Sequence, residues 1–232
     1  MAMRPTVRGW RRNLVLAFGV GVVAAITLTA VAQLLNKKKA PDVVQNPVVN
    51  LSSIPQQGAI LGERGAKVTL IEYADQQCPG CRFYTLNIFP ALVNEYVRPG
   101  KIDMRYHGFP FIGSDSRTAL RFLLAAGLQN RLWQLQEALY RHQGVENSGW
   151  ITDDLIRRLA AQISGLDVNR LFTDAASAAI SRSADEQLAS AEAAGIPETP
   201  TFLIQVGKAK PYSIRVSDVT QFRAALDDAL NG

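Results

Sequence analysis

Apolar and polar residues follow two different periods along the chain, and the changes of period divide it into elements. Residues 66–75, AKVTLIEYAD, are a short and mostly apolar run that predicts a strand buried on both faces. Apolar residues then recur at helical spacing through residues 81–97, CRFYTLNIFPALVNEYV, where Pro90 predicts a kink and the following Pro-Gly pair an end. Residues 101–109, KIDMRYHGF, predict a second strand. Strand, helix and strand in about 40 residues form a βαβ unit, which predicts parallel pairing.

From Ser114 to about Ala194 the pattern is helical throughout. The segments SRTALRFLLAAGLQNRLWQLQEALYRH, TDDLIRRLAAQIS and DVNRLFTDAASAAISRSADEQLASAEAA keep an i, i+3, i+4 spacing, with Thr152 and Asp167 as expected N-caps. Strand patterns return in TPTFLIQVG and PYSIRV, and SDVTQFRAALDDAL predicts a closing helix capped by Ser217. The sequence therefore predicts an α/β domain with a helical block inserted between βαβ and ββα parts.

Residues 14–35 form an apolar run without any charged side chain. As a helix this run would span about 33 Å, enough to cross a bilayer core. An uncleaved transmembrane anchor is favoured by this length and by Trp10 and Lys37–Lys39 at its two ends. The alternative is a secretory signal peptide cleaved after Ala32, within the small-x-small pattern. Both hypotheses place the bulk of the chain outside the cytoplasm, and the anchor predicts a single-pass protein of the cell membrane.

The charge distribution separates the start of the chain from the rest. The net charge is +5, but seven of the 25 basic residues and none of the 20 acidic ones lie in residues 1–40. The remainder has no basic block of the kind that grips phosphates, which argues against a nucleic-acid partner. We expect residues 1–13 to be a short basic cytoplasmic segment, residues 36–57 a proline-containing linker without a period, and residues 58–232 the folded domain.

Both cysteines of the chain lie in one stretch, YADQQCPGCRFY. A Cys78–Cys81 staple would close so short a loop that it would constrain the unfolded chain little. A structural metal site needs four ligands, and only His107 and His142 are available to complete one, at unsuitable spacing. A redox pair fits better, because Cys78 would be the N-cap of a helix that Pro79 begins. The helix end then favours a thiolate at Cys78, with Cys81 as the covered resolving thiol.

Three motifs together resemble the DsbA-like thiol–disulfide oxidoreductases of the thioredoxin superfamily, in their membrane-anchored or secreted form. They are Cys78-Pro79-x-Cys81, Glu72 six residues earlier, and Thr199-Pro200-Thr201-Phe202. The resemblance covers roughly residues 58–230. It implies a thioredoxin-like fold in which the helical block, at about residues 114–194, is the inserted subdomain of this group.

The resemblance also implies roles for single residues. Glu72 would be a buried proton acceptor that serves Cys81. The Thr199–Pro200 bond would be cis, and the backbone beside it would hold the substrate chain in an extended form. Substrate thiolates of exported proteins would attack the Cys78–Cys81 disulfide at Cys78, with no further cofactor. A membrane partner resembling DsbB or vitamin K epoxide reductase would then reoxidise the pair.

Gly80 departs from the best-known oxidase of the group, which has histidine there. Histidine stabilises the thiolate of the reduced form, and Gly80 cannot contribute that charge. Pro79 and Gly80 are thus expected to tune the site, with an oxidising power below that of the strongest oxidases. Two alternatives remain at this point: a reductase or isomerase on the same fold, and a non-catalytic membrane-tethered binding domain.

Overall fold

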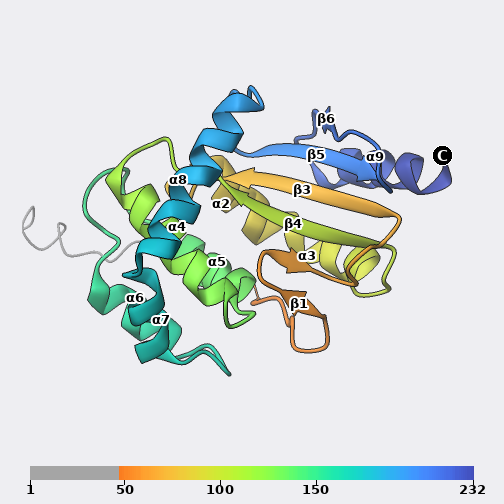
Figure 1. Cartoon of the computed structure of the whole chain (residues 1–232). Coiled ribbons are helices and arrows are strands. Elements are labelled where there is room, and N and C mark those ends of the chain that lie inside the picture. The colour runs from red at the N-terminus through yellow and green to blue at the C-terminus, as the bar shows by residue number, and fades with distance from the viewer. Residues whose placement is uncertain (1–46) are drawn as a thin grey trace, which may run out of the picture. The chain divides into compact units, whose positions relative to one another are not determined.

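A six-stranded sheet forms the centre of the computed structural model, which describes residues 47–232 (Figure 1). The expected segments 1–13 and 14–35 and the first part of the expected linker lie outside the described residues. The strands are β1 (Gln56–Gln57), β2 (Ile60–Leu61), β3 (Val68–Ala74), β4 (Ile102–Gly108), β5 (Thr201–Val206) and β6 (Tyr212–Ile214). They lie in the order β1-β2-β4-β3-β5-β6. The β3–β4 pair is parallel, as the βαβ pattern predicts, and the other neighbours are antiparallel.

Every residue of β3 is buried, which confirms the prediction of a strand covered on both faces. Leu70 faces the main hydrophobic core, whereas Ile71 and Tyr73 belong to a second cluster with Ala191 of the last inserted helix. Alternate side chains of a strand point to opposite faces, so both faces need cover. In Figure 1, β3 runs through the middle of the sheet between β4 and β5.

The helix that follows the cysteines is interrupted, as Pro90 predicts. It is divided into α2 (Pro79–Asn87), α3 (Phe89–Leu92) and the π-helical turn η1 (Val93–Val97). Pro90 has no N–H to donate one turn back, and the break falls at Ile88 just before it. Gly100 ends the segment with φ +75°, a value that glycine adopts without strain.

The inserted block consists of helices alone, and a further helix closes the fold. These helices are α4 (Ser114–Gly127), α5 (Leu132–Arg141), α6 (Asp153–Ala160), α7 (Val168–Ala175), α8 (Ala178–Ala193) and α9 (Val219–Asn231). Thr152 and Asp167 are N-caps whose side chains accept backbone N–H bonds, as predicted. The predicted cap at Ser217 is wrong. Asp218 caps α9 by accepting from the backbone N of Gln221, because the helix begins one residue later and its positive end favours a carboxylate.

The expected linker does not reach Gln57, because residues 47–57 pack on the domain as a strap. Val49, Leu51 and Ile54 are buried in the main core. Arg141 donates to the Pro47 carbonyl at 3.0 Å, and β1 extends the sheet next to β2. The apolar residues of the strap follow neither the helical nor the strand period, because most of its backbone forms no regular secondary structure. The folded domain therefore begins before Gly58.

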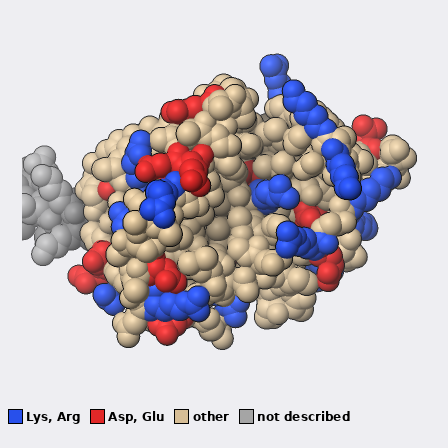
Figure 2. Space-filling view, viewed as in Figure 1, with Lys and Arg blue, Asp and Glu red and all other residues tan. Residues whose placement is uncertain are grey.

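None of the helices formed by residues 47–232 has the length and apolar character that a membrane crossing requires. On the face shown in Figure 2, acidic and basic side chains are interspersed over the helical half of the domain. Basic side chains predominate at the other end of that face, and a band of uncharged surface lies between the two regions.

Candidate active site at the Cys78–Cys81 pair

The two cysteines lie where the central strand passes into a helix. After β3 ends at Ala74, a turn of three residues leads to Cys78, which is the N-cap of α2 with Pro79 at the start of the helix. The backbone N of Cys81 donates to Cys78 Sγ at 3.4 Å. Both residues are free thiols, and their exposed fractions are 7% for Cys78 and 0% for Cys81. Of the pair, only Cys78 keeps any exposure to solvent.

The surroundings of Cys78 stabilise its thiolate. The Cys81 thiol, the Thr199 side chain and the backbone N–H groups of Cys81 and Gly80 together lower the pKa of Cys78 from 9.0 to about 6. These groups outweigh the opposing effect of partial burial. Near neutral pH the first sulfur of the reduced protein is therefore an anion.

Cys81 has the opposite properties. Burial, the neighbouring Cys78 and the charge of Glu72 raise its pKa well above 9.0, against a small opposing effect of the Asp75 N–H. A thiolate at Cys81 is thus unstable and takes up a proton. The pair has one stable thiolate and one sulfur that needs a proton whenever its disulfide is opened.

Glu72 lies in β3 with an exposed fraction of 0%. Gln136 Nε2 donates to Glu72 Oε1 at 3.4 Å, and Oε2 has no hydrogen-bond partner among the described residues. Burial raises the pKa of Glu72 from 4.5 to about 8; the Gln136 bond lowers it and the charge of Cys78 raises it. The carboxyl group can therefore both hold and release a proton near neutral pH.

The predicted cis bond is present at Thr199–Pro200, directly before β5. Cys78 Sγ lies 3.1 Å from the Thr199 carbonyl oxygen, to which it donates when it is protonated. A Cβ added at Gly80 would lie 3.0 Å from Pro200 Cδ and 3.6 Å from Cys78 Sγ. The structure thus brings Thr199, Pro200 and Gly80 together around the exposed side of the first sulfur.

The sequence did not indicate how the inserted helices hold the turn before Cys78. Tyr140 of α5 donates from its hydroxyl to the Asp75 carbonyl at 3.0 Å. Gln143 Nε2 donates to the carbonyls of Gln76 at 2.8 Å and Cys78 at 3.1 Å. Spacing was an available signal for Gln136 and Tyr140, because residues i and i+4 lie on one face of a helix.

A second set of bonds fixes the same turn from α4 and from the loop after α5. Gln77 Nε2 donates to Ser116 Oγ at 3.0 Å and to Asn147 Oδ1 at 3.1 Å, and the backbone N of Asn147 donates to Gln77 Oε1 at 2.6 Å. Ser116 Oγ in turn donates to Asp75 Oδ1 at 2.6 Å.

Within residues 47–232 no three His, Cys, Asp or Glu side chains gather as a metal site would require.

Comparisons with known proteins agree with this geometry. A family model described as thioredoxin matches residues 55–228. The chain is similar to the probable disulfide bond formation protein D of Bacillus anthracis, with 26% identity over 94% of this chain and 97% of that protein. It is also similar to the Bacillus cereus protein of that name, with 27% identity over 73% of this chain and 77% of the relative.

Solved structures resemble the chain in fold. Oxidised BdbD from Bacillus subtilis superposes with a TM-score of 0.66 and 22% identity, over 79% of this chain and all of that one. Wolbachia pipientis α-DsbA1 gives a TM-score of 0.65 and 20% identity, over 79% of this chain and 94% of that one.

Proposed function

The chain belongs to the thioredoxin family as a DsbA-like thiol–disulfide oxidoreductase, and from this premise we propose that it introduces disulfide bonds into exported proteins. Its fold is the expected thioredoxin-like α/β fold with a helical insertion. The observation that carries the proposal is the asymmetry of the pair. Cys78 is a stabilised thiolate at a helix N-terminus, and Cys81 is a buried thiol beside an acid that titrates near neutral pH.

The first half of the reaction opens the disulfide of the oxidised protein. A substrate thiolate attacks Cys78 Sγ, a substrate–Cys78 disulfide forms, and the Cys78–Cys81 bond breaks with its electron pair going to Cys81. Because a Cys81 thiolate is unstable where it lies, it takes the proton of Glu72, which is largely protonated at neutral pH. Glu72 accepts that proton again when the pair is reoxidised, the role that the resemblance implies for it.

The second half transfers the disulfide to the substrate. A second substrate thiolate attacks the substrate sulfur of the mixed disulfide, the substrate disulfide forms, and Cys78 leaves as a thiolate. Its lowered pKa makes it a good leaving group. Two electrons pass from the substrate dithiol to the cysteine pair. The backbone next to Thr199 and Pro200, which adjoins the first sulfur, is the proposed surface for the extended substrate chain.

The proposal includes the location and the partner. Residues 14–35 anchor the domain to the outer face of the cell membrane, and a membrane protein resembling DsbB or vitamin K epoxide reductase reoxidises the pair. Mass spectrometry of the mature protein tests the anchor. A chain that retains residues 14–35 supports it, and an N-terminus at Gln33 shows cleavage after Ala32 and a secreted domain.

Oxidation of a reduced, unfolded ribonuclease by the preoxidised protein tests the function. We expect substrate thiols to disappear in step with reduction of the pair, and Cys78→Ser to abolish this transfer. Cys81→Ser, which has no disulfide to transfer, is mixed instead with ribonuclease that carries scrambled disulfides. Its Cys78 thiolate should attack one of these disulfides, release a ribonuclease thiolate and stay trapped as a mixed disulfide, because the resolving sulfur is absent. A protein that leaves ribonuclease thiols untouched but reduces insulin disulfides would be a reductase instead.

A further inference from the structure

Helix α5 presents two different polar faces, and one of them touches the active site. Gln136 bonds to Glu72, Tyr140 to the Asp75 carbonyl, and Gln143, just beyond the helix, to the carbonyls of Gln76 and Cys78. The inserted subdomain thus supplies three side chains to the turn and the strand that carry the pair.

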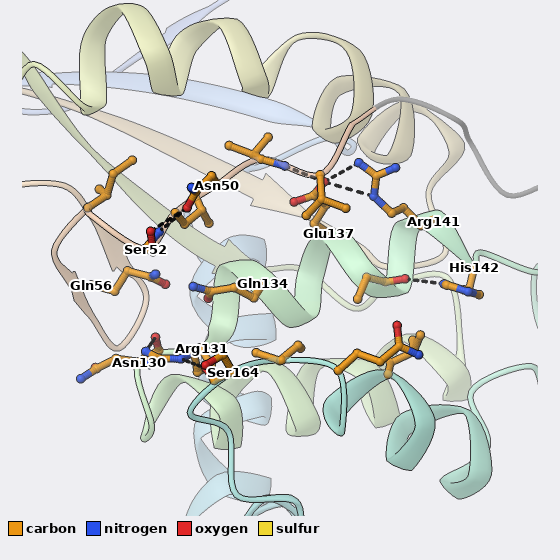
Figure 3. Close-up of a pocket in the computed structure, with 18 residues that line it drawn as sticks. Asn50, Ser52, Gln56, Asn130, Arg131, Gln134, Glu137, Arg141, His142 and Ser164 are labelled. Atoms are coloured by element: carbon orange, nitrogen blue, oxygen red, sulfur yellow. Dashed lines mark hydrogen bonds and ion pairs between the residues drawn. The ribbon is translucent and has the colours of Figure 1, made fainter.

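The other face of α5 lines a cavity of about 550 Å³ between the strap and the end of α6 (Figure 3). Gln134, Glu137, Ala138 and Arg141 lie on this face. Figure 3 shows the Gln134 side chain on the cavity side, and no residue of this face bonds to Glu72. Both Gln134 and Gln136 belong to α5, but only Gln136 bonds to Glu72, so Gln134 can serve as a matched control.

Among the described residues, Gln136 supplies the hydrogen bond that stabilises the charged form of Glu72. The charge of Cys78 raises the pKa of Glu72. The charge of Glu72 in turn raises the pKa values of four buried neighbours, which are Cys81 and Tyr84 of α2, Tyr106 of β4 and Tyr140 of α5. None of these cysteine and tyrosine side chains can carry a positive charge. The three tyrosines stay neutral, because their pKa values are raised well above 10.0. Asp75, also negative when ionised, follows two residues after Tyr73 at the end of β3.

We infer that Gln136 is a positioning residue which, by donating to Glu72 Oε1, holds the carboxyl group and sets the pH range over which Glu72 can protonate Cys81. The inference rests on the proposed function, in which the Cys81 sulfur leaves with the electron pair of the broken disulfide and takes the Glu72 proton. The geometry that carries it is the 3.4 Å bond between two side chains that are 0% and 2% exposed. At a buried site, one amide donor changes the energy of a carboxylate strongly.

Titration of Glu72 in two matched variants tests this directly. Gln136→Met removes the donor at similar volume, and Gln134→Met makes the same change on the cavity face. The side-chain carboxyl carbon of glutamate is followed by NMR in the full-length reduced protein, with Glu72→Gln to assign the signal. We expect a midpoint near pH 8 in the parent and in Gln134→Met, and a higher midpoint in Gln136→Met. Equal midpoints in the two Met variants would overturn the inference.

A second variant, Gln136→Asn, covers the case in which Gln136→Met does not fold. Gln136→Asn keeps the polar group but lacks one methylene, so it should lose reach to Oε1 and raise the midpoint as Gln136→Met does. If Gln136→Met does not fold, the Asn variant decides the matter alone. An unchanged midpoint in Gln136→Asn would then count against the inference.

A kinetic readout separates this inference from the proposed function. The oxidised proteins are reduced with glutathione, and the rate per glutathione thiolate is followed against pH. This rate should fall as Glu72 loses its proton, and the fall should move to higher pH in Gln136→Met but not in Gln134→Met. Unreactive parent protein would refute the proposed function while the NMR shift still tests Gln136. Normal exchange with an unmoved profile would refute the role of Gln136 alone.

Discussion

The two sulfur atoms of the pair are three residues apart but should react at very different pH. Hydrogen bonds lower the pKa of Cys78 to about 6, whereas burial and nearby negative charge raise that of Cys81. Iodoacetamide should therefore label reduced Cys78 with a midpoint at about pH 6 and leave Cys81 unlabelled until strongly alkaline pH. Peptide mass spectrometry over a pH series measures both. Labelling of Cys81 first, or of both together, would contradict the assigned roles.

Glu72 should destabilise the folded protein as pH rises. Folding raises its pKa from 4.5 to about 8, so between these values the folded state binds a proton that the unfolded state has lost. The stability therefore falls with rising pH across this range, and the loss is complete above about pH 8. At about 1.4 kcal/mol per pKa unit, Glu72→Gln should recover several kcal/mol at alkaline pH relative to its effect at mildly acidic pH.

Urea unfolding of the reduced parent and of reduced Glu72→Gln at both ends of this range measures that difference. Glu95, whose pKa is lowered by the Arg223 side chain at the surface, offers a control in Glu95→Gln, which should show no such gain. A pH-independent difference between the parent and Glu72→Gln would show that Glu72 is not buried as a titrating acid.

At the scale of elements, the strand–turn–helix unit that carries the pair could be predicted because local signals specify it. A buried apolar run and an N-cap cysteine followed by proline are visible within a few residues of each other. The partners of Glu72 and of the turn could not be predicted, since helical periodicity shows that a position is buried but not which distant strand it meets. Gln136 and Gln143 contact residues more than 60 positions away.

The start of α2 gives a prediction about Gly80. A side chain at position 80 would point toward both Pro200 and Cys78 Sγ. Gly80→His should raise the reduction potential of the pair by about 30 mV or more, roughly 1.4 kcal/mol for two electrons, by stabilising the Cys78 thiolate. Gly80→Ala controls for the close approach to Pro200. If both variants shift the potential equally, the backbone and not the missing charge controls the site.

At the scale of the whole molecule, the strap makes residues before Gly58 part of the folded domain. Leu51 is 3% exposed, so Leu51→Ala should cost about 2–5 kcal/mol of unfolding free energy. Val48, which is 70% exposed on the same segment, provides the control, and Val48→Ala should change stability by no more than about 0.5 kcal/mol. Urea unfolding compares them. Equal, small effects would mean that the strap is a linker after all.

The reduction potential of the Cys78–Cys81 couple tests the central claim most directly, because it decides which way electrons flow. Equilibration with glutathione buffers, followed by alkylation and mass spectrometry, measures it in the full-length protein. A stabilised Cys78 thiolate without a histidine at position 80 predicts a value above that of thioredoxin, about −270 mV, and below that of DsbA, about −120 mV. A value at or below that of thioredoxin would contradict the account, because such a pair reduces disulfides in exported proteins and does not introduce them.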